Sequence, residues 1–274
     1  MNNREISEVE FTIFDTETTG LSPRQGDHII EIAAQRFQGD SPIKEFSSLI
    51  NPGAGIINKA VSINHISQDM LVDAPSCKEV IPAFIDFVRD SCLCAYNLPF
   101  DIMFLEAELE SIGGIFPSNI ALIDILTMAR KLLPQLPSYS LANVAAYLGI
   151  KEEQKHRAMS DVVLTRKIFN IFWKMLTEKG INQFNQLVSL FSLPRNLLND
   201  LVAQKIAEIQ EAIDQNRVIT IQYFSRTKAD VSIREVVPKK IEQNERGFFM
   251  VGFCKLRGQE RIFRIDHILD IQSR

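Results

Sequence analysis

The sequence predicts a mixed α/β fold, in which helices cover a sheet, followed along the chain by a small β-barrel. Between residues 10 and 176, strands come first and then alternate with helices, a helical connector follows, and five short strands separated by polar turns fill residues 218–271. With 274 residues and 46% hydrophobic content, the chain is long enough for two packed cores. We therefore expect a first unit over 1–178, a connector over 179–204 and a second unit over 205–274.

The first unit opens with three segments that favour strands, at 11–18, 28–37 and 43–50. Short turns join them, so we expect an antiparallel start to the sheet. Ser76, with Glu79 three residues later, has the pattern of a capping box and predicts a helix start. The remaining elements are expected as strands at 93–96 and 121–124, helices at 102–112, after 124 and at 141–148, and a long amphipathic helix at 158–176.

Charge is unevenly distributed along the chain. The net charge is −4, but residues 1–200 carry 17 basic and 24 acidic side chains, a net of −7, and residues 201–274 carry 13 and 10, a net of +3. This asymmetry favours a metal-binding first part and a phosphate-tolerant second part. No signal region and no run of about 20 apolar residues is present, so we expect a cytoplasmic protein without membrane contact. The four cysteines lack zinc-type spacing and are expected to be buried, reduced thiols.

The first strand ends in two acids, Asp15 and Glu17. Alternate side chains of a strand point to the same face, so these carboxylates are expected to lie side by side. Two neighbouring carboxylates repel one another unless a cation lies between them. Hard divalent ions such as Mg²⁺ take oxygen ligands of this kind, so the strand end is a candidate metal site.

Two further segments add to this site. Asp101 comes just after the strand that ends near Asn97, and Asp161 lies in the long helix, five residues after His156. Four acids at one sheet end could hold two Mg²⁺ or Mn²⁺ ions for an in-line displacement at phosphorus. A five-residue offset rotates a helical side chain by roughly 140°, so we expect His156 in the preceding loop. A free histidine titrates near pH 6.5, and such a residue could accept a proton from the attacking water.

Three segments together resemble a known family. They are Asp-Thr-Glu-Thr-Thr-Gly at 15–20, Asn-Leu-Pro-Phe-Asp at 97–101 and His-Arg-Ala-Met-Ser-Asp at 156–161, and they resemble the motifs of the DEDDh 3′→5′ exonucleases. That group contains the proofreading epsilon subunit of bacterial DNA polymerase III. The resemblance implies a ribonuclease H-like fold, two metal ions on the four acids, and His156 as general base. It also implies nucleotide contacts from Thr18, His65 and Phe100.

Two other residues near these motifs have alternative expected roles. Asn97 is expected either to contact the substrate or only to cap the helix that starts beside it. Asp124 is expected to be a structural hydrogen-bond acceptor near the sheet end.

The second unit is similar to the WYL domain, an Sm/SH3-like β-barrel. The similarity lies in residues 218–223, 234–238, 247–252 and 261–266, although Phe248-Phe249-Met250 replaces the Trp-Tyr-Leu triplet. Tyr223, Arg261 and Arg264 could stack a base and pair with phosphates. The alternative is that Tyr223 belongs to the core and that the arginines form a solvated strand face.

The sequence therefore predicts a metal-dependent 3′→5′ exonuclease that acts on single-stranded DNA, with a WYL-like unit that holds or senses nucleic acid. Polymerase or repair proteins are expected as further partners. An exoribonuclease of the same fold is the nearer alternative, because none of the motifs reads the 2′-hydroxyl group. A regulatory nucleic-acid-binding protein with an inactive nuclease domain is the alternative from another class.

Overall fold

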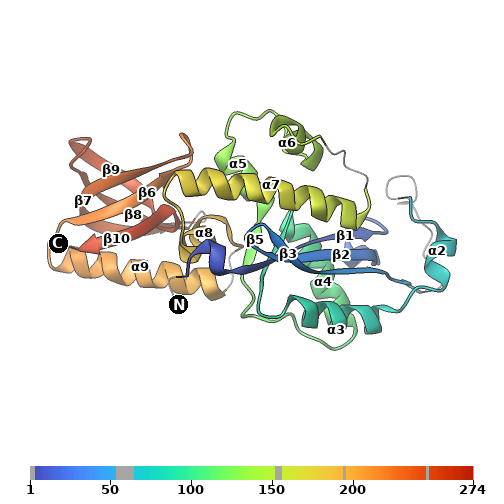
Figure 1. Ribbon diagram of the computed structural model, residues 1–274. Coiled ribbons are helices and arrows are strands. Elements are labelled where there is room, and N and C mark those ends of the chain that lie inside the picture. Colours follow the sequence, from blue (N-terminus) through green and yellow to red (C-terminus); the bar gives the residue numbers. More distant parts are fainter. Residues whose placement is uncertain (1–3, 54–64, 152–155, 194–195, 245–246, 274) are drawn as a thin grey trace.

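The computed structural model describes residues 4–53, 65–151, 156–193, 196–244 and 247–273, and it contains two five-stranded sheets (Figure 1). The first sheet has the strand order β3-β2-β1-β4-β5. Its strands are β1 (Glu10–Thr18), β2 (Ile29–Gln38), β3 (Ser41–Leu49), β4 (Cys92–Ala95) and β5 (Leu122–Asp124). The pairs β1–β2 and β2–β3 are antiparallel, whereas β1–β4 and β4–β5 are parallel. The expected antiparallel start and mixed sheet are confirmed.

Helices cover both faces of this sheet (Figure 1). They are α3 (Cys77–Val88), α4 (Leu98–Ser111), α5 (Ile125–Leu132), α6 (Leu141–Tyr147) and α7 (Ala158–Glu178), while the short α2 (Gln68–Val72) lies at the end of the sheet. Phe11 and Ile13 of β1 belong to the core formed with α5 and α7, while Phe14 packs on the opposite face with α3 and α4. Because side chains alternate along β1, this packing determines which helix Asp15 and Glu17 can contact.

Most elements agree with the expectations from the sequence. The differences are an earlier start of α4 and the additional helix α2. The expected capping box is present, because Ser76 N donates to Glu79 Oε2 at 2.8 Å. Helix α4 begins at Leu98, about one turn before the expected start, with Pro99 in its first turn, where a missing N–H costs nothing. Asp101 therefore lies inside the first turn of this helix. The short helix α2 was not expected.

The second sheet has the strand order β10-β6-β7-β8-β9 and is antiparallel throughout. Its strands are β6 (Ile219–Ser225), β7 (Asp230–Asn244), β8 (Gly247–Cys254), β9 (Gln259–Arg264) and β10 (Ile268–Ser273). All five expected strands are present, and within the described residues the expected small barrel is an open sheet, because β9 and β10 are its two edge strands. The inner face is instead covered by helix α9 (Asn196–Asp214), whose Ile209 and Ala212 are buried among the strand side chains.

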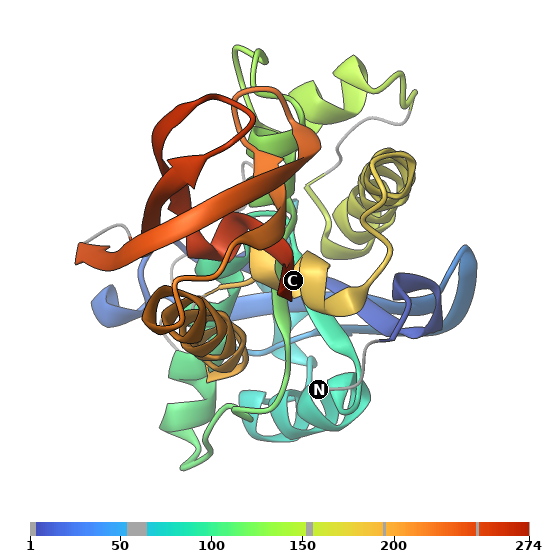
Figure 2. The same ribbon diagram turned by 90° about the vertical axis from the view of Figure 1, so that its left-hand side faces the viewer.

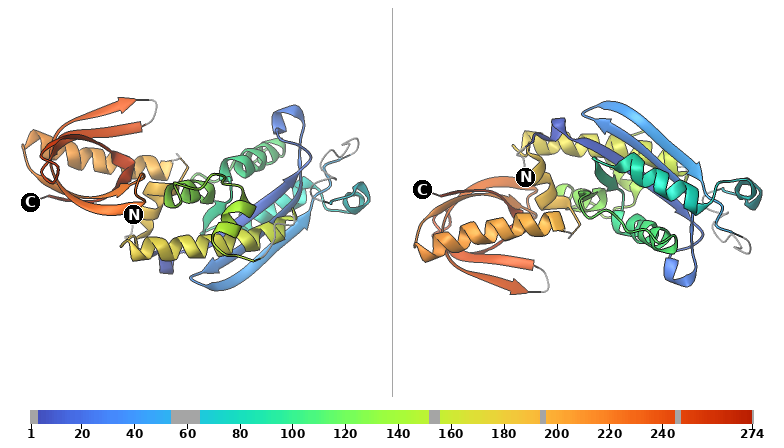
Figure 3. Two further views of the ribbon diagram at one scale, coloured as in Figure 1. Left: turned by 90° about the horizontal axis from the view of Figure 1, so that it is seen from above. Right: turned by 90° about the horizontal axis from the view of Figure 1, so that it is seen from below.

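The two sheets are connected through packed side chains. Phe224, Ala229 and Leu269 of the second unit belong to the same buried cluster as α5 and α7 of the first unit and α8 (Phe184–Phe191) of the connector. Figures 1 and 3 show the second sheet and α9 as a separate lobe, with α8 between the lobes, and Figure 2 looks along the molecule with this lobe in front. Partly buried Lys131 of α5 contributes to this junction, because its Nζ lies 3.3 Å from Nε2 of His267.

Two simpler expectations can be compared with the described residues. All four cysteines are free, and three of them are buried. Within the described ranges, no helix combines the length and apolar character needed to cross a bilayer.

Candidate active site

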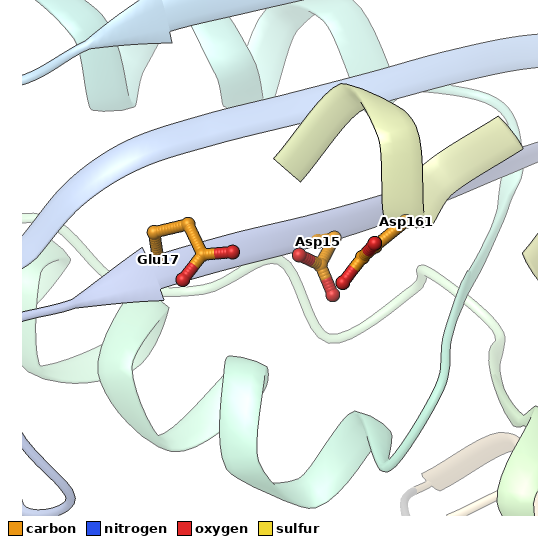
Figure 4. Close-up of side chains that lie close together, drawn as sticks. All are labelled: Asp15, Glu17 and Asp161. Carbon is orange, nitrogen blue, oxygen red and sulfur yellow. The ribbon is translucent and has the colours of Figure 1, made fainter. Parts of the chain in front are cut away.

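Three carboxylates meet at the end of β1. Oxygen atoms of Asp15, Glu17 and Asp161 all lie within 4.8 Å of one another. Figure 4 shows the three side chains grouped between β1 and the start of α7. Asp15 and Glu17 share with Phe11 and Ile13 the face of β1 that packs against α7, and Asp161 lies in the first turn of α7. The strand alternation and the position of one helix therefore bring these acids together.

Asp101 reaches the site from the opposite layer. It is buried, and its Oδ1 accepts hydrogen bonds from Thr16 N at 3.1 Å and from Thr16 Oγ1 at 2.7 Å. Strand β4 pairs with β1 only as far as Ile13, so the Asp101 carboxylate takes an N–H of β1 that lies beyond the end of the paired strand. The cluster within 4.8 Å thus contains three of the four expected acids, and Asp101 lies beside it.

The crowding of these acids changes their pKa values. The pKa of Asp15 is raised well above its usual value, first by burial and then by the charges of Asp101, Asp161, Glu17 and Glu31. Burial likewise raises the pKa of Asp101 to about 7, although the two hydrogen bonds from Thr16 oppose this shift. A cation in the cluster would favour the ionised forms, because it would replace repulsion by attraction.

The residues present fit a hard divalent ion. Every donor is a carboxylate oxygen, the donor type that Mg²⁺ and Mn²⁺ prefer, and the three donor groups already lie close together. Asp15, Glu17 and Asp161 would hold such an ion directly. Asp101 is close enough for its charge to act on Asp15.

His156 is exposed and lies two residues before the start of α7, outside the helix, as expected. Its φ of 52° is in the left-handed region, which is uncommon for a residue other than glycine. Arg157, the next residue, is the N-cap of α7 and forms an ion pair with the buried Glu31 of β2. We did not predict this pair, although an acid in the apolar run Ile29–Ala34 was a visible signal.

The other residues expected at the substrate have mixed environments. Thr18 Oγ1 donates to the carbonyl oxygen of Gly20 at 2.6 Å, so it stabilises the turn after β1. Phe100 is partly buried and packs against Phe104, with ring centroids 5.0 Å apart. His65 is exposed, with a φ of 57°.

Asn97 and Asp124 are the N-cap residues of α4 and α5, but only the side chain of Asp124 accepts hydrogen bonds from the helix starts. Asn97 occupies the N-cap position of α4 with a φ of 68°, but its side chain makes no capping hydrogen bond. Asp124 caps α5 by accepting from Thr127 N at 3.1 Å, and it also accepts from Leu98 N at 3.1 Å, at the start of α4. The expectation that Asp124 is a structural acceptor is confirmed.

In the second unit, the curled sheet has a cavity of about 530 Å³ at its open side. Tyr223, Arg261 and Arg264 all line it. Tyr223 is also part of the core, where its ring packs edge-on against Phe263. Arg264 pairs with Asp266 at 2.6 Å, whereas Arg261 is exposed. The basic residues that line the cavity are Arg226, Lys228, Arg234, Arg257, Arg261 and Arg264.

Comparison with known proteins finds a family match for each of the two parts of the chain. Residues 12–169 match the family described as Exonuclease, and residues 204–273 match the WYL domain. The PolC-type DNA polymerase III of Thermotoga maritima is 37% identical over 185 residues, which cover 68% of this chain and 13% of that protein. The PolC-type enzyme of Caldanaerobacter subterraneus subsp. tengcongensis is 32% identical over 267 residues, covering 94% of this chain and 18% of that protein. This chain thus spans less than one fifth of these relatives.

A solved structure agrees on the fold. The nuclease domain of 3′hExo, described as a DEDDh family member bound to rAMP, superposes with a TM-score of 0.55 at 17% identity, over 68% of this chain and 96% of that one. The family match covers more than half of the chain, and the WYL match covers the second sheet and the second half of α9. The chain therefore belongs to the exonuclease family and carries a WYL domain after its nuclease fold.

Proposed function

We propose that this protein is a metal-dependent 3′→5′ exonuclease that hydrolyses the terminal phosphodiester bond of single-stranded DNA and releases nucleoside monophosphates. The observation that carries the proposal is the meeting of Asp15, Glu17 and Asp161 within 4.8 Å, with Asp101 next to them. Carboxylates gathered in this way are costly unless they bind cations. The PolC-type relatives and the nuclease fold support the same reaction class.

Each residue has a defined part in this reaction. Two Mg²⁺ or Mn²⁺ ions, when bound, supply Lewis-acid stabilisation of the attacking and departing oxygens. The four acids hold the ions, and His156 accepts a proton from the attacking water. The water oxygen forms a bond to phosphorus, the bond from phosphorus to the 3′ oxygen breaks, and the departing 3′ oxygen gains a proton.

The test uses oligonucleotides labelled at the 3′ or the 5′ end, in matched DNA and RNA versions, with and without Mg²⁺. A ladder of shortened 5′-labelled products, formed only with Mg²⁺, would support the proposal. Asp15→Asn is the matched control, because it removes one charge and keeps the shape of the side chain. Preference for RNA would identify an exoribonuclease instead, and nucleic-acid binding without any Mg²⁺-dependent cleavage would identify a regulatory protein.

For the WYL domain, we propose that it holds the part of a long single strand that lies away from the 3′ end. The six basic side chains around the cavity and the ring of Tyr223 support this, because single-strand binders combine cationic grooves with aromatic rings. Arg261→Ala should weaken binding to a strand of roughly 30 nucleotides, and leave hydrolysis of a strand of about five nucleotides unchanged. Lys239→Ala is the control, because Lys239 is exposed on β7 and does not line the cavity. Equal loss in both variants would argue against the proposal.

We further propose that the functional division of the chain follows residues 1–178, 179–204 and 205–274, with Thr18, His65, Asn97 and Phe100 near the terminal nucleotides. The first unit would then contain the whole reaction, and polymerase or repair proteins would be its partners in the cell.

A further inference from the structure

Glu31 of β2 is a further carboxylate on the face of the sheet that carries Asp15 and Glu17. It pairs directly with Glu17 in the register of β1 and β2, and residues opposite one another in a ladder point to the same side. Its charge also contributes to the raised pKa of Asp15. It is only 4% exposed, so a buried acid at this place requires a partner. Its partner is not a further acid of the cluster but a basic residue from another element.

Arg157 supplies that partner. Its Nη2 lies 2.8 Å from Glu31 Oε1, and its Nε lies 3.1 Å from Oε2, the two-pronged geometry that makes arginine–carboxylate pairs strong and specific in direction. Glu31 Oε2 also accepts a hydrogen bond from Ala158 N at 3.0 Å. The carboxylate of β2 therefore caps the first turn of α7, where the Arg157 side chain itself makes no cap.

Along the chain, Arg157 and Ala158, which contact Glu31, lie between His156 and Asp161. Asp161 N donates to the carbonyl oxygen of Arg157 at 3.1 Å, so the turn that Glu31 caps also carries Asp161. On the other side, His156 has a left-handed backbone, a conformation that costs free energy and persists only where its surroundings fix it.

We propose that the Glu31–Arg157 ion pair is a positioning device for His156, which fixes the backbone at the start of α7 so that the histidine faces the reacting phosphate. This inference rests on the proposed function, because it assumes that His156 accepts the proton. Neither Glu31 nor Arg157 is a catalytic residue in this proposal. Their effect on the reaction passes through the position of His156.

The test is a double variant, Glu31→Gln with Arg157→Gln, which removes the ion pair and leaves the net charge near the metal ligands unchanged. We expect kcat to fall about 10- to 100-fold, as for a small displacement of a catalytic group, with KM for a DNA strand and the half-saturating Mg²⁺ concentration within about threefold of wild type. Arg157→Lys, which keeps the charge but loses the two-pronged geometry, should recover part of kcat. Lys239→Gln, which removes an exposed ion pair with Glu260, is the control and should keep wild-type kinetics.

The decisive comparison repeats the double variant in a His156→Ala background under single-turnover conditions. If the pair acts through His156, its removal should cost less than about threefold there, because the group that it positions is already absent. An equal decrease in rate on removal of the pair, with and without His156, would overturn the inference and leave the proposed function intact. A tenfold rise in KM of the double variant at unchanged kcat would do the same. Wild-type activity of His156→Ala itself would instead refute the general-base assignment and, with it, the inference. Thermal unfolding of each variant checks that it is folded, and Arg157→Lys gives the same comparison if the double variant is not.

Discussion

Acidification should weaken the junction between the two sheets through His267. This histidine is buried, and its Nε2 lies 3.3 Å from the Nζ of Lys131, which also donates to the carbonyl oxygen of Leu190 at 2.6 Å. Burial and the charge of Lys131 lower the pKa of His267 from its usual value of 6.5 to about 4, against the opposing charge of Asp266. The neutral ring can accept a hydrogen bond from the ammonium group, whereas a protonated ring would bring two cations together.

The sign and size of the effect follow from proton linkage. Between pH 6.5 and pH 4 the unfolded chain binds a proton at this histidine and the folded chain does not, so acidification favours unfolding. With pKa values of 6.5 and about 4, the contribution of His267 to the free energy of unfolding falls by about 2 kcal/mol between pH 7 and pH 5. The contribution is fully present above pH 6.5 and is lost as the pH falls towards 4.

The assay is urea unfolding of wild type and His267→Gln at several pH values, followed by the fluorescence of Trp173. The difference between the two proteins is the informative quantity, because Asp101, with its pKa raised to about 7, shifts stability in the opposite direction in both. We expect wild type minus variant to decrease by about 2 kcal/mol from pH 7 to pH 5. A difference that stays constant with pH would refute the argument that His267 is neutral in the folded protein.

Three further predictions concern the catalytic unit. Asp15→Asn should raise the free energy of unfolding measured without metal by about 1 kcal/mol or more, because it relieves like-charge repulsion. The same variant should abolish the increase in Tm that Mg²⁺ gives wild type. An unchanged effect of Mg²⁺ on Tm would exclude Asp15 as a ligand. Thr16→Val removes the 2.7 Å hydrogen bond to Asp101 and should lower kcat about tenfold in steady-state assays, since a bond to a charged group contributes about 1.5–3 kcal/mol; wild-type kcat would contradict this. Asp124→Ala should cost about 1–3 kcal/mol in urea unfolding, because it uncaps α5 and leaves Leu98 N without its acceptor, and a loss below the error of the method would show that Asp124 is dispensable.

The parts of the site that depend on local chain geometry could be predicted from the sequence. The alternation of a strand placed Asp15 and Glu17 on one face, and a helical rotation placed His156 outside α7. The partners that depend on the packing of distant elements could not be predicted. Thr16 meets Asp101 only because β4 stops short of it.

Register and helix packing account for the other differences. Glu31 lies beside the catalytic acids because β2 pairs with β1 in one particular register, which the sequence of neither strand fixes by itself. The expected small barrel is an open sheet for a related reason. Five short strands indicate a curled sheet, but they do not show that α9 packs Ile209 and Ala212 onto its inner face in place of a closing strand pair.

The packing between the sheets bears on how the two units should be studied. Sequence comparison divides the chain near residue 204, but the buried cluster that contains Phe224 and Leu269 crosses that division. Partly buried Lys205 crosses it as well, because its Nζ donates to Ser189 Oγ at 2.6 Å and to the carbonyl oxygen of Ile268 at 2.5 Å. A fragment cut in the connector would expose apolar side chains and deprive this ammonium group of its acceptors, and each of these changes costs stability. The full chain is therefore the appropriate material for the kinetic comparisons proposed above.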